Sequence, residues 1–193
     1  MPAPIEAKVF ADKNTVAVAR ALLGKLLVRA RPDGAVERHR IVEVEAYHGE
    51  RDRACHASRG RTPRTEVMFG PAGVWYVYLC YGVHELLNLV TGPEGHPAAV
   101  LIRGLETVSG PGRLTRHLGI DRSFNARPAM PATGLWLEED DVRVRPRDVV
   151  ATPRIGVDYA GPTWAAKKWR FVISTTSSTV IASRPASRRR TRT

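Results

Sequence analysis

The spacing of apolar residues along the chain predicts one helix near the N-terminus followed by a series of β-strands. Apolar residues recur at the helical period from Val16 to Leu23, between Asn14, which suits an N-cap, and Gly24, which ends the pattern. The residues Arg-Pro-Asp-Gly at 31–34 are those that a tight turn requires. Apolar and β-branched runs predict strands at 25–30, 36–45, 74–80, 85–91, 98–105 and 169–174.

The order of these elements indicates an α+β fold. Strands that are joined by hairpins, without regular long crossover helices, are typical of an antiparallel sheet. A second helix is expected near 112–118, after Gly110 and Pro111, and the region 120–168 is rich in turns with short strands. We therefore expect a single domain over 1–183, in which a curved antiparallel sheet is flanked by helices.

Composition narrows the class of protein. The chain has 193 residues, of which 43% are hydrophobic, enough for one well-formed core. No apolar run approaches the roughly 20 residues that a membrane helix needs, and the first residues include Glu6 and lack the apolar segment of a signal peptide. Cys55 and Cys80 are too few for a disulfide framework. We expect an intracellular protein with reduced thiols and no membrane span.

The charge balance favours a polyanionic partner. Lys and Arg number 30 against 19 Asp and Glu, which gives a formal net charge of +11. A surface this basic suits nucleic acid, through phosphate contacts and the release of counterions. The last ten residues, 184–193, hold five arginines and no acidic residue. Because this tail lacks apolar anchors, we expect it to be disordered and to act only through its charge.

The first pattern with chemical meaning lies in the strand segment 41–47, with the sequence Ile-Val-Glu-Val-Glu-Ala-Tyr. Because a strand has a period of two, Glu43, Glu45 and Tyr47 share one face while the valines face the other way. Such a face is often simply exposed to water, and the pattern alone does not separate the two glutamates. The polar loop that follows carries His56, so this histidine and Tyr47 can converge on the last carboxylate.

Aromatic residues dominate the strand that runs from 74 to 80. Most aromatic strand residues belong to the core, and we interpret Trp75 and Tyr76 in that way. Tyr78 shares a strand face with Tyr76. Together with Tyr47, it can offer the π-faces on which an extruded base stacks.

The turn after this strand carries another aromatic residue. Tyr81 stands beside Gly82, with Val83 and His84 next along the chain. A large ring beside a turn glycine suits a wedge inserted between base pairs. The loop 59–65 adds guanidinium and hydroxyl donors that proline stiffens, as phosphate-contacting loops often do, although a merely solvated loop looks similar.

Taken together, these runs resemble the alkyladenine (3-methyladenine) DNA glycosylases of the mammalian type. The resemblance covers about 19–174 and depends on the order and spacing of the runs 42–47, 54–56, 61–64, 68–71, 76–78, 81–82, 88, 100–103, 110–114 and 154–157. The family implies a mixed α+β fold whose basic face binds the minor groove of duplex DNA as a monomer, with no metal and no redox cofactor. One departure is the connection 105–110, which is shorter than relatives usually have.

The resemblance also implies roles for individual residues. Glu45 matches the general base that activates water, which separates it from Glu43, and Arg103 and the backbone of Ile155 match groups beside that water. The remaining matches are Tyr47, His56 and Tyr78 in the walls of the base pocket, Asn88 against the exocyclic amine of guanine, Tyr81 with its flanking Val83 and His84 as the intercalating group, and Thr62 and Arg64 at phosphates.

These roles fit hydrolysis at a sugar carbon. The transition state is oxocarbenium-like, so one carboxylate can both accept a proton from water and stabilise the positive charge. Lysine is absent between Lys25 and Lys167, which leaves few candidates for a Schiff-base nucleophile. We therefore expect a monofunctional glycosylase that flips alkylated or deaminated purines, of the 3-methyladenine, hypoxanthine or ethenoadenine type, out of duplex DNA and leaves an abasic site.

Three other functions remain open at this point. A zinc site could use the two cysteines with His56 and His84, although their spacing matches no common zinc pattern. A module that binds RNA or single strands would use the same basic and aromatic surface without the chemistry of Glu45. A magnesium-dependent phosphodiesterase would use Glu43 and Glu45, although the sequence offers no further cluster of carboxylates.

Overall fold

A computed structural model describes residues 3–174 of the chain. The predicted basic tail, 184–193, and the end of the predicted domain, 175–183, lie outside the described residues. The helix α1 (Thr15–Leu22) begins as expected, because the side chain of Asn14 accepts a hydrogen bond from the backbone N–H of Ala17 at 3.1 Å. Gly24 then adopts a φ of +85°, a conformation that glycine tolerates, and leads the chain into the first strand.

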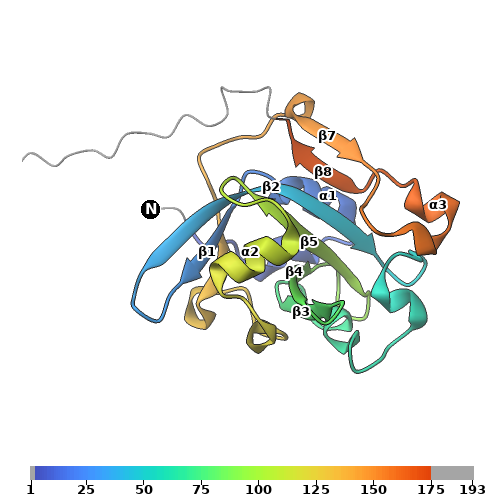
Figure 1. Cartoon of the computed structure of the whole chain (residues 1–193), viewed down its shortest axis with the longest axis horizontal. Helices are drawn as coiled ribbons and strands as arrows, with labels where there is room; N and C mark the ends of the chain where they lie inside the picture. The colour runs from blue at the N-terminus through green and yellow to red at the C-terminus, as the bar shows by residue number, and fades with distance from the viewer. Residues whose placement is uncertain (1–2, 175–193) are drawn as a thin grey trace, which may run out of the picture.

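Eight strands lie within the described residues, and every pairing between them is antiparallel, as the hairpin-rich sequence predicted. They are β1 (Leu26–Ala30), β2 (Val36–His48), β3 (Trp75–Cys80), β4 (His84–Val90), β5 (Ala98–Leu105), β6 (Leu135–Glu138), β7 (Val149–Thr152) and β8 (Arg170–Ile173). The main path through the sheet is β3-β4-β5-β2-β1-β6, and β8 pairs with both β2 and β7 (Figure 1). The sheet is open, and the α+β class is confirmed.

Two further helices accompany the sheet. The predicted helix after Gly110 is α2 (Pro111–Leu118), which packs on β4 and β5 and buries Leu114 and Leu118. The sequence did not predict α3 (Pro162–Ala165), a single turn in the region that was expected to contain only turns and short strands. No helix within residues 3–174 is long and apolar enough to cross a lipid bilayer.

The strand β2 is the longest of the sheet and extends past its predicted end at Glu45. Its pairing with β5 continues through Tyr47 to His48. The first half of β2 pairs with β1, whereas its second half has β5 on one side and β8 on the other. The two glutamates of β2 therefore lie in the interior of the sheet, where neighbouring strands cover both edges.

The two faces of the sheet differ in chemistry because side chains alternate between them. One face packs with α1 and α2 in the main core, and its strand residues are Val44, Ala46, Trp75, Val77, Leu87, Leu89, Val100 and Ile102. On the other face, the register places Tyr76 opposite Asn88, Asn88 opposite Leu101, and Leu101 opposite Glu45. Side chains of the loop 52–69 and of 157–165 pack over parts of this second, more polar face.

Candidate active site

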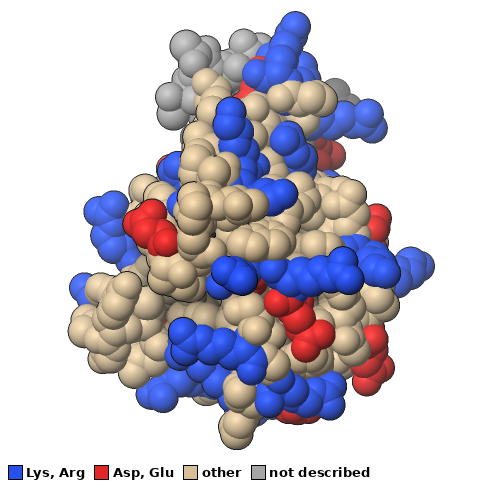
Figure 2. Space-filling model, turned by 90° about the vertical axis from the view of Figure 1, so that its right-hand side faces the viewer, with Lys and Arg blue, Asp and Glu red and all other residues tan. Residues whose placement is uncertain are grey.

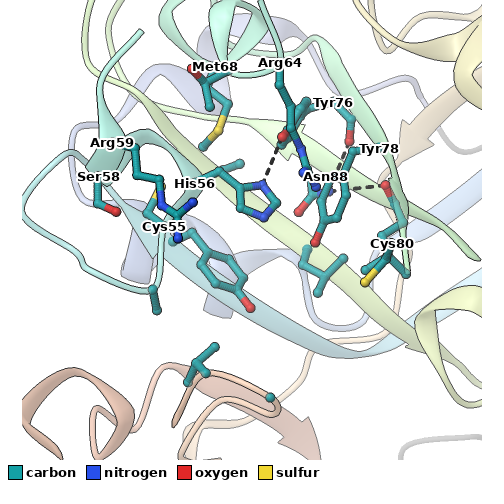
Figure 3. Close-up of a pocket in the computed structure, with 18 of the residues that line it drawn as sticks. Cys55, His56, Ser58, Arg59, Arg64, Met68, Tyr76, Tyr78, Cys80 and Asn88 are labelled. Carbon is teal, nitrogen blue, oxygen red and sulfur yellow. Dashed lines mark hydrogen bonds between the residues drawn. The ribbon is translucent and has the colours of Figure 1, made fainter. Parts of the chain in front are cut away.

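A cavity of about 930 Å³ opens on the polar face of the sheet. Its walls come from β2, β3, β4 and β5, from the loop that carries 53–68, and from the segment 155–159. Figure 3 shows His56, Tyr76, Tyr78 and Asn88 gathered around this space, with the loop that carries Cys55 and Arg59 beside them. Cavities of roughly 300–1,000 Å³ are the usual size for small-molecule sites, so the space is large enough for a nucleoside.

Glu45 is completely buried, with 0% of its surface exposed. Its Oε1 atom accepts the backbone N–H of Ile155 at 2.8 Å, and its Oε2 atom accepts the hydroxyl of Tyr47 at 2.8 Å. The same Oε2 atom lies 3.4 Å from Nη1 of Arg103. Tyr47, Arg103 and Ile155 all line the cavity, so the groups that hold the carboxylate also face the cavity.

The environment of Glu45 makes it a stronger base than an exposed glutamate. Burial raises the pKa of Glu45, while the charge of Arg103, the N–H of Ile155 and the hydroxyl of Tyr47 act against that rise. Burial, together with the adjacent Glu45, also raises the pKa of Tyr47 well above its ordinary value. The phenol therefore stays protonated and can donate its hydrogen bond.

Glu43, the second carboxylate of β2, has different partners. Its Oε1 atom accepts Nε of Arg103 at 3.1 Å and Nε of Arg170 at 2.7 Å, and only 8% of the residue is exposed. Both glutamates of this strand face are therefore buried. The interpretation of the face as simply exposed to water is wrong. The two carboxylates differ in that Glu43 is bound by two guanidinium groups.

One wall of the cavity is an aromatic cluster. Nδ1 of His56 lies 3.0 Å from the hydroxyl of Tyr76, and the His56 ring meets the Tyr78 ring edge-on at 4.6 Å between centroids. The ring thus contacts tyrosines of β3, whereas the sequence pattern predicted convergence on the carboxylate of β2. Burial, with the nearby charges of Arg64 and Arg59, lowers the pKa of His56 to about 4, so its ring is neutral near pH 7.

Asn88 and Arg64 complete this wall. The Nδ2 atom of Asn88 donates to the backbone carbonyls of Tyr76 at 3.1 Å and Leu86 at 3.3 Å. Since Asn88 is also buried, these bonds fix the orientation of its amide beside the cavity. The guanidinium of Arg64, an exposed residue, lies 4.9 Å above the centre of the Tyr78 ring.

The remaining predicted site residues form what we call the rim, of which Tyr81, Thr62 and Arg64 line the cavity, whereas Val83 and His84 are not among its lining residues. Tyr81 and Val83 are exposed in the turn between β3 and β4, and Tyr81 has a φ of +50°, which is uncommon for a residue other than glycine. His84 is also exposed, and its ring packs closely on Gly112 at the start of α2. Thr62 and Arg64 are exposed in the loop after His56, and both line the cavity.

The sequence did not single out a buried ion pair behind the site. Both side chains of the pair, Asp52 and Arg154, have 0% exposure. Nη2 of Arg154 donates to Oδ1 of Asp52 at 2.9 Å, and Nη1 donates to Oδ2 of Asp52 and to the carbonyl of Ala46. The sequence contains both partners, Asp52 in the loop after β2 and Arg154 in the run Arg-Ile-Gly-Val. They are far apart in the chain, so no local pattern joins them.

This ion pair fixes two of the groups that bind Glu45. The guanidinium of Arg154 lies 4.8 Å above the centre of the Tyr47 ring, and the next residue in the chain is Ile155. Because Arg154 precedes Ile155 in the chain, the bonds that hold the Arg154 side chain to Asp52 also restrict the backbone whose N–H is directed at Glu45. The ion pair therefore supports both the phenol of Tyr47 and the N–H of Ile155, which donate hydrogen bonds to Glu45.

Positive charge gathers on the side of the molecule where the loop 49–70 and α3 lie in Figure 1. Figure 2 views this side, on which Lys and Arg side chains cover more of the surface than Asp and Glu. The exposed arginines of the loop are Arg51, Arg53, Arg59, Arg61 and Arg64. Within the described residues, no group of three or more His, Cys, Asp or Glu is placed to hold a metal ion, and Cys55 and Cys80 are free thiols.

The chain is similar in sequence to known proteins. The family model for methylpurine-DNA glycosylase matches residues 9–110 and 106–177. A protein of Anaeromyxobacter dehalogenans with the name "Putative 3-methyladenine DNA glycosylase" is 48% identical over 188 residues, which cover 93% of this chain and 86% of that protein. Proteins with the same name are 45% identical in Methanocella arvoryzae, with coverages of 87% and 92%, and 49% identical in Myxococcus xanthus, with coverages of 84% and 86%.

Proposed function

Because the chain belongs to the methylpurine-DNA glycosylase family, as a DNA-3-methyladenine glycosylase that hydrolyses N-glycosyl bonds in damaged DNA, we propose that Glu45 activates the attacking water. The observation that carries this proposal is a fully buried carboxylate whose binding partners, Tyr47, Arg103 and Ile155, all line one large cavity. The damaged nucleotide would be flipped from the duplex into that cavity.

In the proposed reaction, Glu45 takes a proton from water while the water oxygen bonds to the anomeric carbon of the sugar. The bond from that carbon to the base breaks, and its electron pair leaves with the base. Negative charge on the carboxylate also stabilises the oxocarbenium-like transition state. The contact from Arg103 is the longest of the three around Glu45, so we propose that the water binds on that side.

The aromatic wall suits a purine that carries positive charge. A purine alkylated at N3 or N7 is cationic and stacks favourably on the faces of Tyr47 and Tyr78. Because the pKa of His56 is lowered to about 4, this ring adds no positive charge near the base and remains free to hydrogen-bond to the nucleotide. We propose that the fixed amide of Asn88 crowds the exocyclic amine of guanine and so disfavours that normal base.

The rim residues suit contact with the DNA duplex. We propose that Tyr81, flanked by Val83 and His84, fills the gap that the flipped nucleotide leaves, and that Thr62 and Arg64 contact phosphates. The basic side in Figure 2 would then face the DNA. We also propose that the protein acts on the duplex as a monomer, as the family resemblance implies.

The substrate range follows from the same pocket. Neutral damaged purines, such as hypoxanthine or ethenoadenine, can stack on the same rings, although they are poorer leaving groups than cationic bases. We therefore propose alkylated and deaminated purines as substrates. We also propose that the product is an abasic site without strand cleavage, because the absence of lysine between Lys25 and Lys167 leaves few candidates for a Schiff-base nucleophile.

The test is base release from duplexes that each carry one 3-methyladenine, hypoxanthine or ethenoadenine, measured as alkali-labile sites. We expect Glu45→Gln to lower the single-turnover rate by about 10²–10⁴-fold, the usual contribution of a general base, while binding to damaged duplex is retained. The control is Glu50→Gln, which removes an exposed carboxylate from the loop after β2 and should release base at the wild-type rate.

Two outcomes would contradict the proposal. Wild-type activity in Glu45→Gln would remove the carboxylate from its role. Failure of the wild-type protein to release any of these bases would contradict the proposed substrate range.

A further inference from the structure

The strand β2 holds a second buried carboxylate, Glu43, that the proposed reaction does not use. It pairs with Gly104 of β5, where a side-chain β-carbon would lie only 3.1 Å from the Cβ atom of Glu43. This glycine therefore leaves room for the glutamate between the strands. Because the carboxylate of Glu43 is buried, it needs partners that compensate its charge.

Those partners form a continuous chain of contacts across four strands. Thr152 of β7 accepts Nη1 of Arg170 at 3.0 Å, and Arg170 of β8 donates Nε to Glu43 at 2.7 Å. Glu43 accepts Nε of Arg103, which lies on β5, and Nη1 of that same guanidinium faces Glu45. Arg103 is thus shared by Glu43 and Glu45. On its other side, Glu43 is held by Arg170.

We propose that Glu43 is a positioning residue for the glycosylase reaction, which holds Arg103 by its Nε atom and compensates part of its positive charge, so that Glu45 remains an effective base. The inference rests on the function proposed above for Glu45. Glu43 is the carboxylate that the sequence pattern alone did not separate from Glu45.

The charges around Glu45 support this role. The charged and titratable groups that face it, or that bind those groups, are Tyr47 and Glu43 on β2, Arg103 on β5, Asp52 in the loop after β2, Arg154 after β7 and Arg170 on β8. Three carboxylates, counting Glu45, thus face three guanidinium groups. Loss of the charge on Glu43 leaves the cluster with one uncompensated positive charge beside the base.

The proposal predicts the direction in which the pH dependence of the reaction changes when Glu43 is substituted. In Glu43→Gln, the charge of Arg103 acts on Glu45 alone, which stabilises the ionised carboxylate and makes it a weaker base. The acid limb of the rate profile, where Glu45 becomes protonated, should therefore move to lower pH. The rate on the plateau should fall about tenfold to a hundredfold, as expected for loss of a charge-assisted contact in a buried network.

A second substitution should act in the opposite direction. In Arg170→Gln, Glu43 has only Arg103 as a charged partner and compensates more of its charge. The carboxylate of Glu45 then feels less positive charge, and the acid limb should move to higher pH. This variant also keeps the proposal testable if Glu43→Gln does not fold.

The experiment measures single-turnover release of ethenoadenine from a duplex across the pH range, with the dissociation constant of each variant for the same duplex. We expect opposite shifts of the acid limb in Glu43→Gln and Arg170→Gln, with dissociation constants within about threefold of the wild type. The matched control is Glu106→Gln, which removes a carboxylate from its pair with Arg40 outside the site and should leave rate and profile unchanged.

An unchanged acid limb in both variants would overturn the inference, whatever happens to the plateau rate. A shift of both limbs in the same direction would also overturn it, because the two substitutions remove opposite charges. Failure of the underlying function is distinguishable, since it would appear as retained activity in Glu45→Gln.

Discussion

Beneath the cavity, Glu45 is completely buried and bound by three donors, whereas Tyr81 on the rim is 92% exposed in a turn with positive φ. We call the groups around Glu45 the floor, namely Glu45 with Tyr47, Arg103 and the N–H of Ile155. Fixed groups can stabilise a transition state without rearranging at the moment of reaction. An exposed ring on a turn can instead enter a duplex. The floor is therefore suited to chemistry, and the turn that carries Tyr81 is suited to DNA contact.

The floor and the rim also differ in how they affect stability. The floor buries charges, and their desolvation is compensated only while each charge keeps its partner. The turn of Tyr81 buries little and has only local backbone strain to compensate. Substitutions in or behind the floor should therefore change stability, whereas those on the rim should leave it nearly unchanged.

The largest expected effect is the loss of the ion pair that supports the floor. Asp52→Ala leaves the guanidinium of Arg154 buried without its carboxylate, and we expect the free energy of unfolding to fall by about 3–5 kcal/mol. Urea denaturation followed by tryptophan fluorescence measures this change. Asp158→Ala, at an exposed carboxylate of the segment after Arg154, is the control and should stay within about 0.5 kcal/mol of the wild type. A similarly small loss in Asp52→Ala would contradict the role of the pair.

Local sequence patterns predicted those parts of this molecule that depend on neighbouring residues. The cap at Asn14, the helix after Gly110 and the hairpins follow from short-range rules, and the structure confirms them. The alternation along β2 also placed Glu43 and Glu45 on one face, because a strand has a period of two. The length of β2 was underestimated, since its last residues are strand only through pairing with β5.

The contacts of the floor could not be predicted from local patterns. Arg154 lies 102 residues from Asp52 along the chain, and their pairing depends on how the loop after β2 meets the segment after β7. The two arginines at Glu43 come from β5 and β8, on opposite sides of β2. The distinction between the two glutamates came from family resemblance, because the local pattern treats them alike.

A smaller effect concerns the stability of the floor itself. Burial raises the pKa of Glu45 above its unfolded value, so the folded state binds a proton more tightly. The stability that this proton provides is present below the ordinary pKa and is lost as pH rises through the raised one. At neutral pH, Glu45→Gln removes a buried charge, and we expect it to raise the free energy of unfolding by about 0.5–2 kcal/mol.

This gain should shrink as pH falls to about 4, where protonation makes the wild-type side chain neutral and similar to an amide. Urea denaturation at the two pH values measures the difference, and Glu50→Gln is the exposed control that should show little gain at neutral pH. A variant less stable than the wild type at neutral pH would mean that the partners of Glu45 outweigh its desolvation.

The smallest effect on stability is expected on the rim, at Tyr81. Because glycine adopts a positive φ without strain, Tyr81→Gly should leave the free energy of unfolding unchanged or raise it by less than about 1 kcal/mol. Its preference for damaged over undamaged duplex should fall, since the ring that we propose to fill the gap is gone. Competition binding measured by fluorescence anisotropy tests this, with Tyr81→Phe as a control that keeps the ring and the preference. Wild-type preference in Tyr81→Gly would assign the wedge to another residue, and a large loss of stability would break the contrast between rim and floor.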